Sequence, residues 1–296
     1  MQYDVVVIGG SYAGMAAALQ LVRARKAVLV IDAGQRRNRF ASHSHGFLTQ
    51  DGVDPGEIAR TARAQLQAYP HLVWKDGKAV AVTGARDDFT VMTDDGLSHH
   101  ARRVLFATGV IDQLPEIAGL PERWGRTIFH CPYCHGYELD MGRIGVIATG
   151  AMSIHQAELL MDWGKVTLLT NSAVEPDLDA RRKLETRGVT LDDGRIDRIE
   201  GEADMLMADG RRLNFAGIFT ATRCVPSSPL AEELGCAMEE TPMGIQVRTD
   251  EEKQTTIPGV FACGDAARVP HSVSLAVGDG AWAGIQLHRS LLWPDA

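Results

Sequence analysis

The chain has 296 residues, enough for two domains of ordinary size that each bury a core of their own. Its 45% of apolar and 23% of charged residues exclude a fibrous or an intrinsically disordered protein. The net charge of −8 argues against nucleic acid and against an anionic membrane surface as partners.

Membrane insertion and a disulfide scaffold are also disfavoured. No apolar run approaches the roughly 20 residues that span a bilayer, and no signal-peptide pattern precedes the first apolar strand. Of the five cysteines only Cys131 and Cys134 are closely spaced, which indicates a redox or metal pair in a reducing compartment. We therefore expect a cytoplasmic protein without a membrane segment.

The first 32 residues have the pattern of a dinucleotide-binding unit. An apolar strand over 4–8 runs into the glycine-rich turn 9–14, and an alanine-rich helix and a second strand over 27–31 follow. The glycines let this turn approach a pyrophosphate, whose charge the helix N-terminus stabilises, although Ser11 stands where a glycine is expected. Asp32 follows the second strand and can accept hydrogen bonds from a ribose.

The middle of the chain repeats this unit with less of its glycine pattern. Residues 143–147 and 166–170 are predicted strands on either side of a helix over 154–163. Of the glycine pattern only Gly150 remains, and Thr170-Asn171-Ser172 follows the second strand in place of an acidic residue. The pattern predicts that the dinucleotide-binding fold is kept, and it leaves the ligand of this unit open.

Other predicted strands bring further groups to the edge of the first sheet. Residues 73–92 alternate enough for a small antiparallel sheet, and a strand over 104–109 ends in Ala107-Thr108-Gly109. A buried-type strand within 256–265 carries Asp265 at its carboxyl end. Because ligands bind at this edge of an open α/β sheet, we expect Asp265 at the binding site.

The densest reactive cluster is the segment 130–135, His-Cys-Pro-Tyr-Cys-His. A Cys-x-x-Cys pair at the start of a helical turn lets one thiol ionise readily and the other resolve a mixed disulfide. His135 and Glu138 are placed in sequence to relay a proton. A zinc site is disfavoured, because four ligands within six residues cannot easily surround one ion, and we expect no metal. An inert pair of thiols and a glutaredoxin-like motif are the other interpretations, although the pair lies between two dinucleotide-like units.

On these residues the chain resembles the low-molecular-weight thioredoxin reductase family of flavoprotein disulfide oxidoreductases. The resemblance covers nearly the whole length and implies FAD as the cofactor. It implies an α/β fold of two Rossmann-like (three-layer ββα) dinucleotide-binding domains, with a discontinuous FAD domain. We place the FAD domain at residues 1–113 and 245–296. A central NAD(P)-binding-like domain, which carries the redox pair, is placed at residues 114–244.

The resemblance also implies roles for individual residues. In the family the second cysteine, here Cys134, faces the flavin, the first, here Cys131, exchanges with the substrate, and Asp265 would contact the ribityl chain. Homodimerisation is implied by the family alone. The residues expected to hold FAD are Gly9, Gly10, Ser11, Ala13, Gly14, Asp32, Ala33, Asn38, Arg39, His45, Val82, Ala107, Thr108, Gly109, Gly264 and Asp265.

The chain departs from the family members that use NADPH. Their central domain has an intact glycine pattern and a basic string that binds the 2′-phosphate, whereas Thr170-Asn171-Ser172 stands here and the nearest arginines are Arg181 and Arg182. His135 replaces an aspartate, and His271-Ser272-Val273 replaces Arg-Gln-Ala. The eroded glycine pattern and the missing basic string argue against tight binding of NADPH.

The string over 130–138 resembles a branch of the family that oxidises the dithiols of natural products such as gliotoxin and holomycin, with oxygen as the acceptor. The resemblance implies His135 as the base, with His271 as a further candidate. The preferred function is FAD-dependent oxidation of a small or peptidic dithiol. The alternatives are an NADPH-dependent reductase, whose partner would be a thioredoxin-like protein, and a flavin-bound redox sensor without turnover.

Several other residues are predicted to serve packing only. Cys224, Cys236 and Cys263 are expected to be buried, inert thiols. Met205 and Met207 alternate with Leu206 in a predicted strand and are expected in the core.

Overall fold

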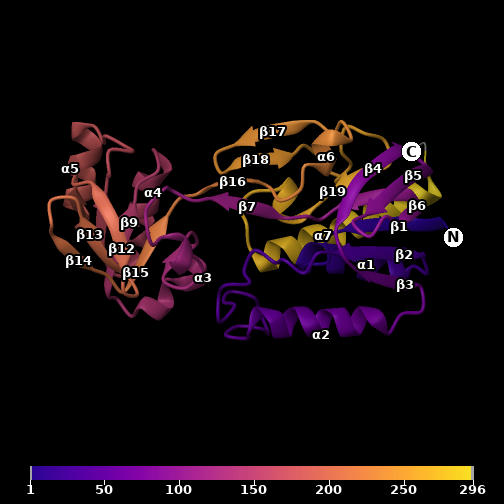
Figure 1. The fold of residues 1–296 in the computed structure, drawn as a ribbon, viewed down its shortest axis with the longest axis horizontal. Coiled ribbons are helices and arrows are strands. Elements are labelled where there is room, and N and C mark those ends of the chain that lie inside the picture. Colours follow the sequence, from indigo (N-terminus) through magenta and orange to yellow (C-terminus); the bar gives the residue numbers. More distant parts are fainter. Residues whose placement is uncertain (1, 295–296) are drawn as a thin grey trace. The chain divides into compact units, whose positions relative to one another are not determined.

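The computed structural model of this chain describes residues 2–294 and divides into two compact units. The first unit consists of Met1–Arg37, Pro55–Ile111 and Cys224–Ala296, and the second of Asn38–Asp54 and Asp112–Arg223. Both units contain parallel sheets and helices, which are labelled in Figure 1. The parallel sheets and helices confirm the predicted α/β fold class. The first unit is discontinuous, because the second unit interrupts it in sequence.

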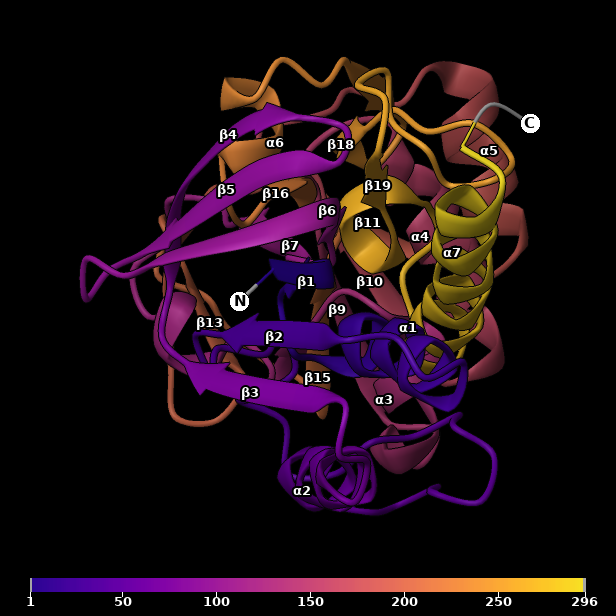
Figure 2. The ribbon, with the colours of Figure 1, turned by 90° about the vertical axis from the view of Figure 1, so that its right-hand side faces the viewer.

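A seven-stranded sheet forms the centre of the first unit, in the order β3-β2-β1-β6-β5-β4, with β19 also paired to β6. Figure 2 shows these strands stacked in this order. Five strands are parallel: β1 (Gln2–Ile8), β2 (Val28–Asp32), β3 (Leu72–Asp76), β6 (Ser98–Phe106) and β19 (Val260–Ala262). The antiparallel strands are β4 (Ala79–Ala85) and β5 (Asp88–Thr93).

The prediction of a small antiparallel sheet over 73–92 is therefore wrong for its first part. The strand β3 pairs in parallel with β2, with Val28 opposite Leu72. The chain crosses from β2 to β3 through helix α2 (Pro55–Gln67), and a crossover of this kind returns the next strand in the same direction.

Two helices of the first unit, α1 (Tyr12–Arg23) and α7 (Val273–Leu292), lie side by side (Figure 2). Small side chains allow this close approach, since Ala13 and Ala17 of α1 are buried. The helix α7 begins where the Ser272 hydroxyl accepts a hydrogen bond from the Leu275 N–H, which satisfies one of the first N–H groups of the helix.

A smaller sheet, in the order β17-β18-β16-β7, belongs partly to the first unit. Its elements, with the short helix that connects them, are β7 (Val110–Gln113), β16 (Arg223–Pro226), α6 (Leu230–Glu233), β17 (Met238–Thr241) and β18 (Gly244–Val247).

Hydrophobic packing explains where the units divide. Leu230, Cys236 and Val247 share one core cluster with Val6 and Phe106 of the main sheet. Residues 224–244 therefore pack with the first unit, whereas the predicted boundary lies at residue 245. Residues 38–54 group with the second unit.

The second unit is built on a five-stranded parallel sheet, in the order β11-β10-β9-β15-β8. Its strands are β8 (Ile128–Phe129), β9 (Arg143–Ile147), β10 (Lys165–Leu169), β11 (Thr190–Asp192) and β15 (Gly217–Thr220). An antiparallel sheet consists of β12 (Ile196–Glu200), β13 (Asp204–Met207) and β14 (Arg212–Asn214). Met205 and Met207 are buried in the core of this unit, as predicted.

The helices of the second unit are short: α3 (Pro132–His135), α4 (Met152–Leu159) and α5 (Leu178–Thr186). Single 3₁₀ turns occur at η1 (Pro121–Arg123), η2 (Tyr137–Leu139) and η3 (Leu160–Asp162) in this unit, and at η4 (Gly264–Ala267) in the first. The helix predicted over 154–163 thus starts earlier and tightens into a 3₁₀ turn at its end, a common way for a helix to end.

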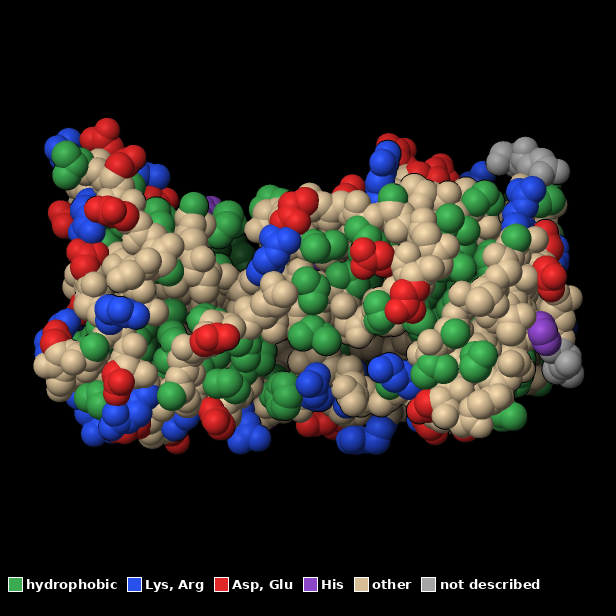
Figure 3. Space-filling view, turned by 45° about the horizontal axis from the view of Figure 1, so that its top comes forward, with side chains coloured by type: hydrophobic (Ala, Val, Ile, Leu, Met, Phe, Trp, Pro, Cys, Tyr) green, Lys and Arg blue, Asp and Glu red, His purple; other side chains and the backbone are tan. Residues whose placement is uncertain are grey.

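Within residues 2–294 no helix is long and apolar enough to cross a membrane. Acidic and basic side chains are interspersed on the face drawn in Figure 3, without a large patch of one sign.

Candidate functional site

The two closely spaced cysteines form a disulfide, with Cα atoms 5.4 Å apart. Cys131 is the N-cap of α3, Pro132 is its first residue, and the Cys134 N–H donates to the Cys131 carbonyl at 3.3 Å. Proline favours this first helical position, so the Cys-Pro-Tyr-Cys sequence itself brings the two sulfurs onto one turn. A disulfide that closes a single turn constrains little else, which suits a pair that opens and closes.

Aromatic rings and an amide hold the segment around the disulfide. The His135 ring is stacked on Phe129 of β8 at 4.2 Å between centroids, and the Tyr133 ring meets Trp163 edge-on at 5.3 Å. Gln156 of α4 donates to the His130 carbonyl at 2.9 Å. Tyr133 nevertheless remains 71% exposed, so one side of the Cys-x-x-Cys turn is open to solvent.

Burial, and to a smaller extent the repulsion of His45, together lower the pKa of His135 to about 4. At neutral pH the ring is therefore neutral. Proton transfer to it from an ordinary thiol, whose pKa is about 8.5, is uphill by roughly four powers of ten. His135 is accordingly a weak proton acceptor, and its role as the catalytic base stays a prediction.

The same shift predicts a pH dependence of stability. The pKa of His135 is about 4 in the folded chain and 6.5 in the unfolded chain, so the unfolded chain binds more protons between these values. Stability is therefore expected to fall as the pH drops from about 6.5 to about 4. In His135→Asn, the loss of unfolding free energy between pH 7 and pH 5 should be smaller than in the wild type, as measured by urea denaturation.

The exposed His155→Asn is the matched control, because it also removes one histidine from the second unit. An unchanged loss of stability in His135→Asn would contradict the assignment of the shift to this ring.

A second histidine lies in the segment 38–54 of the same unit. The His45 Nε2 is 3.5 Å from the Glu138 Oε1, and its Nδ1 is 3.6 Å from the Asp51 Oδ1. Asp51 also accepts the Gly46 N–H at 2.8 Å, which fixes the carboxylate in the turn. The structure thus brings the predicted site residue Glu138 together with His45.

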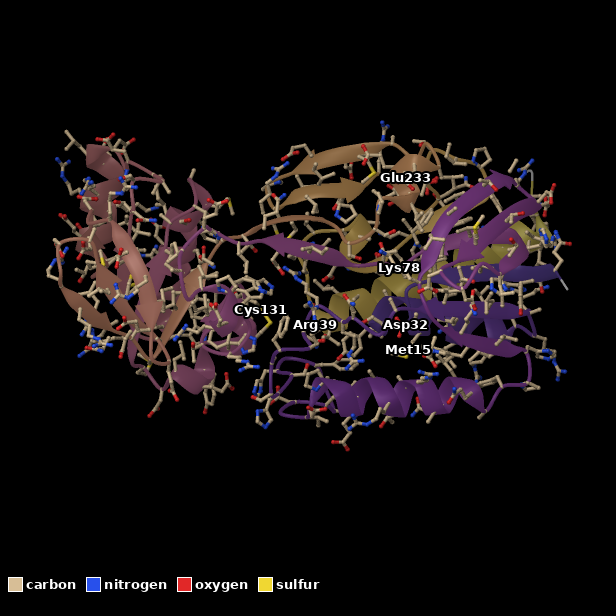
Figure 4. All side chains as sticks on the ribbon, in the orientation of Figure 1. Met15, Asp32, Arg39, Lys78, Cys131 and Glu233 are labelled. Carbon is tan, nitrogen blue, oxygen red and sulfur yellow. A yellow bond between two sulfur atoms is a disulfide. The ribbon has the colours of Figure 1, made fainter. Side chains whose placement is uncertain are left out.

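Three residues predicted to hold FAD, Asn38, Arg39 and His45, fall in the second unit. The Arg39 guanidinium lies over the Phe40 ring, 4.2 Å from its centroid. Figure 4 labels Arg39 and Cys131, which belong to the same unit. The FAD contacts of these three residues stay predictions.

The glycine-rich turn of the first unit lies at the carboxyl ends of β1 and β2. Gly9 has a φ of +107°, and the Gly10 N–H donates to the Asp32 Oδ1 at 3.1 Å. A Cβ at Gly14 would lie 1.8 Å from the Gly9 carbonyl oxygen. The glycines therefore let backbone pack directly on backbone in this turn, which we call the cradle, and a pyrophosphate-binding turn before a helix requires such packing. Ser11 and Ala13 of the predicted set lie within it.

A cavity of about 330 Å³ adjoins this cradle at the end of β2. Figure 4 labels Asp32 and Lys78 from its wall. It is lined by Asp32, Ala33, Gly34, Gln35, Asp76, Gly77, Lys78 and Asp94. The carboxylate of Asp32 gives it an acceptor for ribose hydroxyls. Val82, also predicted to contact FAD, belongs to the hydrophobic core cluster of this unit, and its FAD contact stays a prediction.

The other end of the cradle is the turn η4 after β19. The Gly264 N–H donates to the buried Asp279 Oδ2 at 2.8 Å, and the Asp279 Oδ1 lies 2.7 Å from the Lys253 Nζ. The Asp265 Oδ2 accepts a hydrogen bond from the Arg37 Nη1 at 3.3 Å. The Asp265 Oδ1 is buried without a hydrogen-bond partner among the described residues. A buried acceptor of this kind fits a hydroxyl donor such as those of a ribityl chain.

The sequence did not predict three of these residues as part of the site: Arg37, Lys253 and Asp279. Asp279 stands in a Gly-Asp-Gly string, but its partner Gly264 is 15 residues away, on another element. The string alone indicates a turn, whereas Asp279 lies within α7, so no local signal identifies it.

His271 is buried in the first unit beside Arg37 and Cys224. Arg37 Nη1 lies 2.9 Å from the His271 Nδ1, and the Cys224 Sγ lies 4.0 Å from it. Because a guanidinium only donates, this geometry assigns the accepting role to Nδ1 and the proton to Nε2. His271 then offers a donor, and its predicted role as a base stays a prediction.

The segment Ala107-Thr108-Gly109 follows β6 at the same sheet edge. The Ser227 hydroxyl donates to the Thr108 carbonyl at 2.6 Å, and the Ser227 N–H donates to the Gly109 carbonyl at 3.0 Å. Ser227 thus holds this segment in place without side-chain crowding.

In the corresponding turn of the second unit, one backbone N–H bonds to a side chain of the same turn. The Thr149 N–H donates to the Ser153 hydroxyl at 2.9 Å, and the Thr149 hydroxyl donates to the Ala221 carbonyl at 2.6 Å. At the end of β10 the Thr170 hydroxyl and Arg181 both bind Asp193, at 3.0 Å and 2.9 Å. A carboxylate therefore engages Arg181, one of the two arginines nearest to this strand end.

Residues 3–280 match the protein family described as pyridine nucleotide-disulphide oxidoreductase. The chain belongs to this family. It is 30% identical to thioredoxin reductase sirT of Leptosphaeria maculans over 99% of this chain and 95% of that protein. Thioredoxin reductase tcpT of Claviceps purpurea is 29% identical, over 98% of this chain and 94% of its own length.

Two solved structures are similar over nearly their whole length. An oxidoreductase from Agrobacterium tumefaciens has a TM-score of 0.98 and 56% identity, covering 100% of both chains. HlmI has a TM-score of 0.91 and 35% identity, covering 99% of this chain and 94% of its own.

This pyridine nucleotide-disulphide oxidoreductase is thus a thioredoxin reductase-like flavin enzyme. The family uses FAD, with NADPH as its reductant, and acts on disulfide substrates or thioredoxin. The cradle, the Asp32 carboxylate and the buried Asp265 oxygen fit FAD.

Proposed function

We propose that this chain oxidises a small or peptidic dithiol to a disulfide through Cys131 and Cys134, with FAD as cofactor and oxygen as final acceptor. The observation that carries this direction is the nucleotide turn of the second unit, where Ser153 takes the Thr149 N–H and Asp193 engages Arg181. Both groups would otherwise serve a phosphate. Electrons then enter from a thiol rather than from NADPH.

The proposed chemistry starts from the oxidised pair. A substrate thiol gives its proton to a base, and its thiolate attacks the Cys131 sulfur, so that the disulfide breaks and Cys134 leaves as the thiolate. The second substrate thiol, on losing its proton, attacks the mixed disulfide and releases the oxidised product and the Cys131 thiolate. Two electrons then reside on the cysteine pair.

When bound, FAD supplies the two-electron acceptor that reoxidises the pair, and oxygen takes these electrons as hydrogen peroxide. For this we assign the predicted FAD residues of the first unit to the cofactor. Glu138 and His135 are assigned to proton movement near the pair, and His271 to the cofactor side, as a donor beside Asp265.

An anaerobic titration of the yellow holoenzyme with NADPH, then NADH, then dithiothreitol tests the proposal. We expect bleaching of the flavin by dithiothreitol alone and recovery of the colour on admitting air. Rapid bleaching by NADPH would overturn the proposed direction and favour the reductase.

The NADPH-dependent reductase is the second candidate, supported by the family's use of NADPH and by relatives named thioredoxin reductase. Its partner would be a thioredoxin-like protein. A redox sensor is the third: in an oxygen electrode it would consume little oxygen beyond one equivalent with any dithiol, whereas the oxidase turns over many times.

We further propose a homodimer in the cytoplasm. The cytoplasm suits the three buried thiols outside the disulfide, Cys224, Cys236 and Cys263. Burial raises the pKa of Cys236 and of Cys263, which keeps both thiols protonated and unreactive. The homodimer is inferred from the family alone. The mass of the holoenzyme, measured by sedimentation, tests this inference.

A further inference from the structure

The guanidinium of Arg37 joins three segments of the first unit that are distant in the sequence. Its Nη1 lies 3.3 Å from the Asp265 Oδ2 and 2.9 Å from the His271 Nδ1, and its Nη2 donates to the Cys224 Sγ at 3.4 Å. These partners belong to the turn η4, to the segment before α7 and to the strand β16. A planar guanidinium has several N–H donors in a fixed fork, so one side chain can hold several acceptors in a set arrangement.

Little water reaches this group of side chains. Arg37 and Asp265 are 16% and 18% exposed, and His271 and Cys224 are buried. A carboxylate that has lost most of its water is costly unless a cation compensates it. Arg37 supplies that cation, so its removal would disturb Asp265 far more than the loss of an ion pair on the surface.

The contact with Arg37 engages only one of the two Asp265 oxygens. The Oδ2 accepts from the guanidinium, whereas the Oδ1 is buried without a hydrogen-bond partner among residues 2–294. Because a carboxylate is planar, a side chain held through one oxygen also has its other oxygen fixed in direction. Asp265 therefore presents an oriented acceptor for a hydroxyl group of a bound cofactor.

The contact with His271 decides which ring nitrogen carries the proton. A guanidinium cannot accept a hydrogen bond, so the Nδ1 has the lone pair and the Nε2 has the proton. The Cys224 Sγ lies 4.0 Å from the same Nδ1, so side chains of the protein occupy this side of the ring. The guanidinium that orients Asp265 thus also sets His271 as a hydrogen-bond donor.

We propose that Arg37 is a positioning residue of the flavin site, which orients Asp265 as an acceptor and His271 as a donor through one guanidinium. In this role it acts through its two neighbours rather than on the cofactor itself. The inference rests on the cofactor assignments of the proposed function, but it does not depend on the direction in which electrons flow. It requires that Arg37 and the Asp265 carboxylate affect FAD binding through the contact that they share.

The test compares Arg37→Met, Asp265→Asn and the double variant. Dissociation of FAD from the diluted holoenzyme is followed through the fluorescence of the released flavin, in a reaction that includes neither a thiol nor NADPH. Each single variant is expected to bind FAD at least about tenfold more weakly, the effect of a lost hydrogen bond to a charged group. The loss in the double variant should be at least about threefold smaller than the product of the single losses, because the coupling contact is already absent.

Arg60→Met is the matched control, because Arg60 is an exposed arginine of α2 in the same unit. It should bind FAD like the wild type. Arg37→Lys keeps the charge but replaces the planar fork by a single ammonium, which cannot hold both partners in the same arrangement. Its dissociation constant for FAD should lie between those of Arg37→Met and the wild type.

The position of the His271 proton gives a readout that requires neither catalysis nor a variant that folds. In holoenzyme labelled with nitrogen-15, at about pH 8, where an ordinary histidine is neutral, NMR is expected to show a protonated Nε2 and an unprotonated Nδ1. The signals of this ring are identified by their loss in His271→Gln. In Arg37→Met the preference for this tautomer should weaken, since the donor to Nδ1 is absent.

Three results would overturn the inference: independent losses in the double variant, wild-type FAD affinity in Arg37→Met, or a proton on Nδ1 of His271 in the wild type. Unchanged FAD affinity in Asp265→Asn would refute the assignment of Asp265 to the cofactor, and the inference with it. Coupled losses together with rapid bleaching of the flavin by NADPH would support the role of Arg37 while the proposed direction fails.

Discussion

Cys134→Ser is expected to leave the flavin oxidised in the presence of excess dithiothreitol without oxygen. Its hydroxyl cannot form the disulfide that Cys131 and Cys134 make on one turn. Cys131 therefore stays a thiol, and no disulfide is left at this turn for a substrate thiolate to attack. Oxygen consumption with dithiothreitol should fall at least about a thousandfold, because placement of both sulfurs on one turn is lost. Stopped-flow absorbance measures the flavin and an oxygen electrode measures turnover.

Cys236→Ser is the matched control. Its sulfur is buried in the first unit, 3.4 Å from the Thr255 hydroxyl, and a serine hydroxyl can keep this hydrogen bond. Its activity should equal that of the wild type. Bleaching of Cys134→Ser at the wild-type rate would remove the cysteine pair from the mechanism.

Gly14→Ala is expected to yield protein that has lost most of its FAD. The new Cβ would lie 1.8 Å from the Gly9 carbonyl oxygen and 3.0 Å from its carbon, and both are backbone atoms that no side-chain rotation can move away. The turn must open, which costs roughly 3 kcal/mol of stability and disturbs the N–H groups that face a pyrophosphate. Flavin absorbance per mole of protein and urea denaturation measure both effects.

Gly278→Ala tests whether the effect belongs to this turn. Gly278 lies exposed within α7, and an added Cβ meets no atom within 4 Å. Alanine there should keep FAD and raise the unfolding free energy by about 0.5–1 kcal/mol, because glycine costs backbone entropy in a helix. Full FAD content in Gly14→Ala would show that the cradle is not the cofactor site.

Local sequence predicted the strands, turns and helices that carry the site. The glycine turn and Asp32 lie at adjoining strand ends, where the Gly10 N–H meets the Asp32 carboxylate, and Cys131 and Cys134 lie on one turn. These features depend on residues a few positions apart, or on strands joined by one helix, so periodicity and turn residues are enough to place them.

Contacts between segments that are distant in the sequence could not be predicted from the sequence. Strand β3 alternates like an antiparallel strand, yet the crossover from β2 makes it parallel. The hydrophobic core into which the segments 38–54 and 224–244 pack decides to which unit each belongs. A hydrophobic side chain can pack into either core, so its identity does not predict its partners.

By itself the sequence determined the chemical groups of this protein: a Cys-x-x-Cys turn, a glycine-rich dinucleotide turn and a second nucleotide turn that keeps only Gly150 of the glycine pattern. Only the tertiary structure decided which side chains contact one another around these groups. It set His45 between Asp51 and Glu138, buried one Asp265 oxygen without a hydrogen-bond partner within residues 2–294, and paired Arg181 with Asp193. Ion pairs and hydrogen bonds form between atoms that are a few ångströms apart in space. The number of residues between two side chains does not predict their distance in the folded chain.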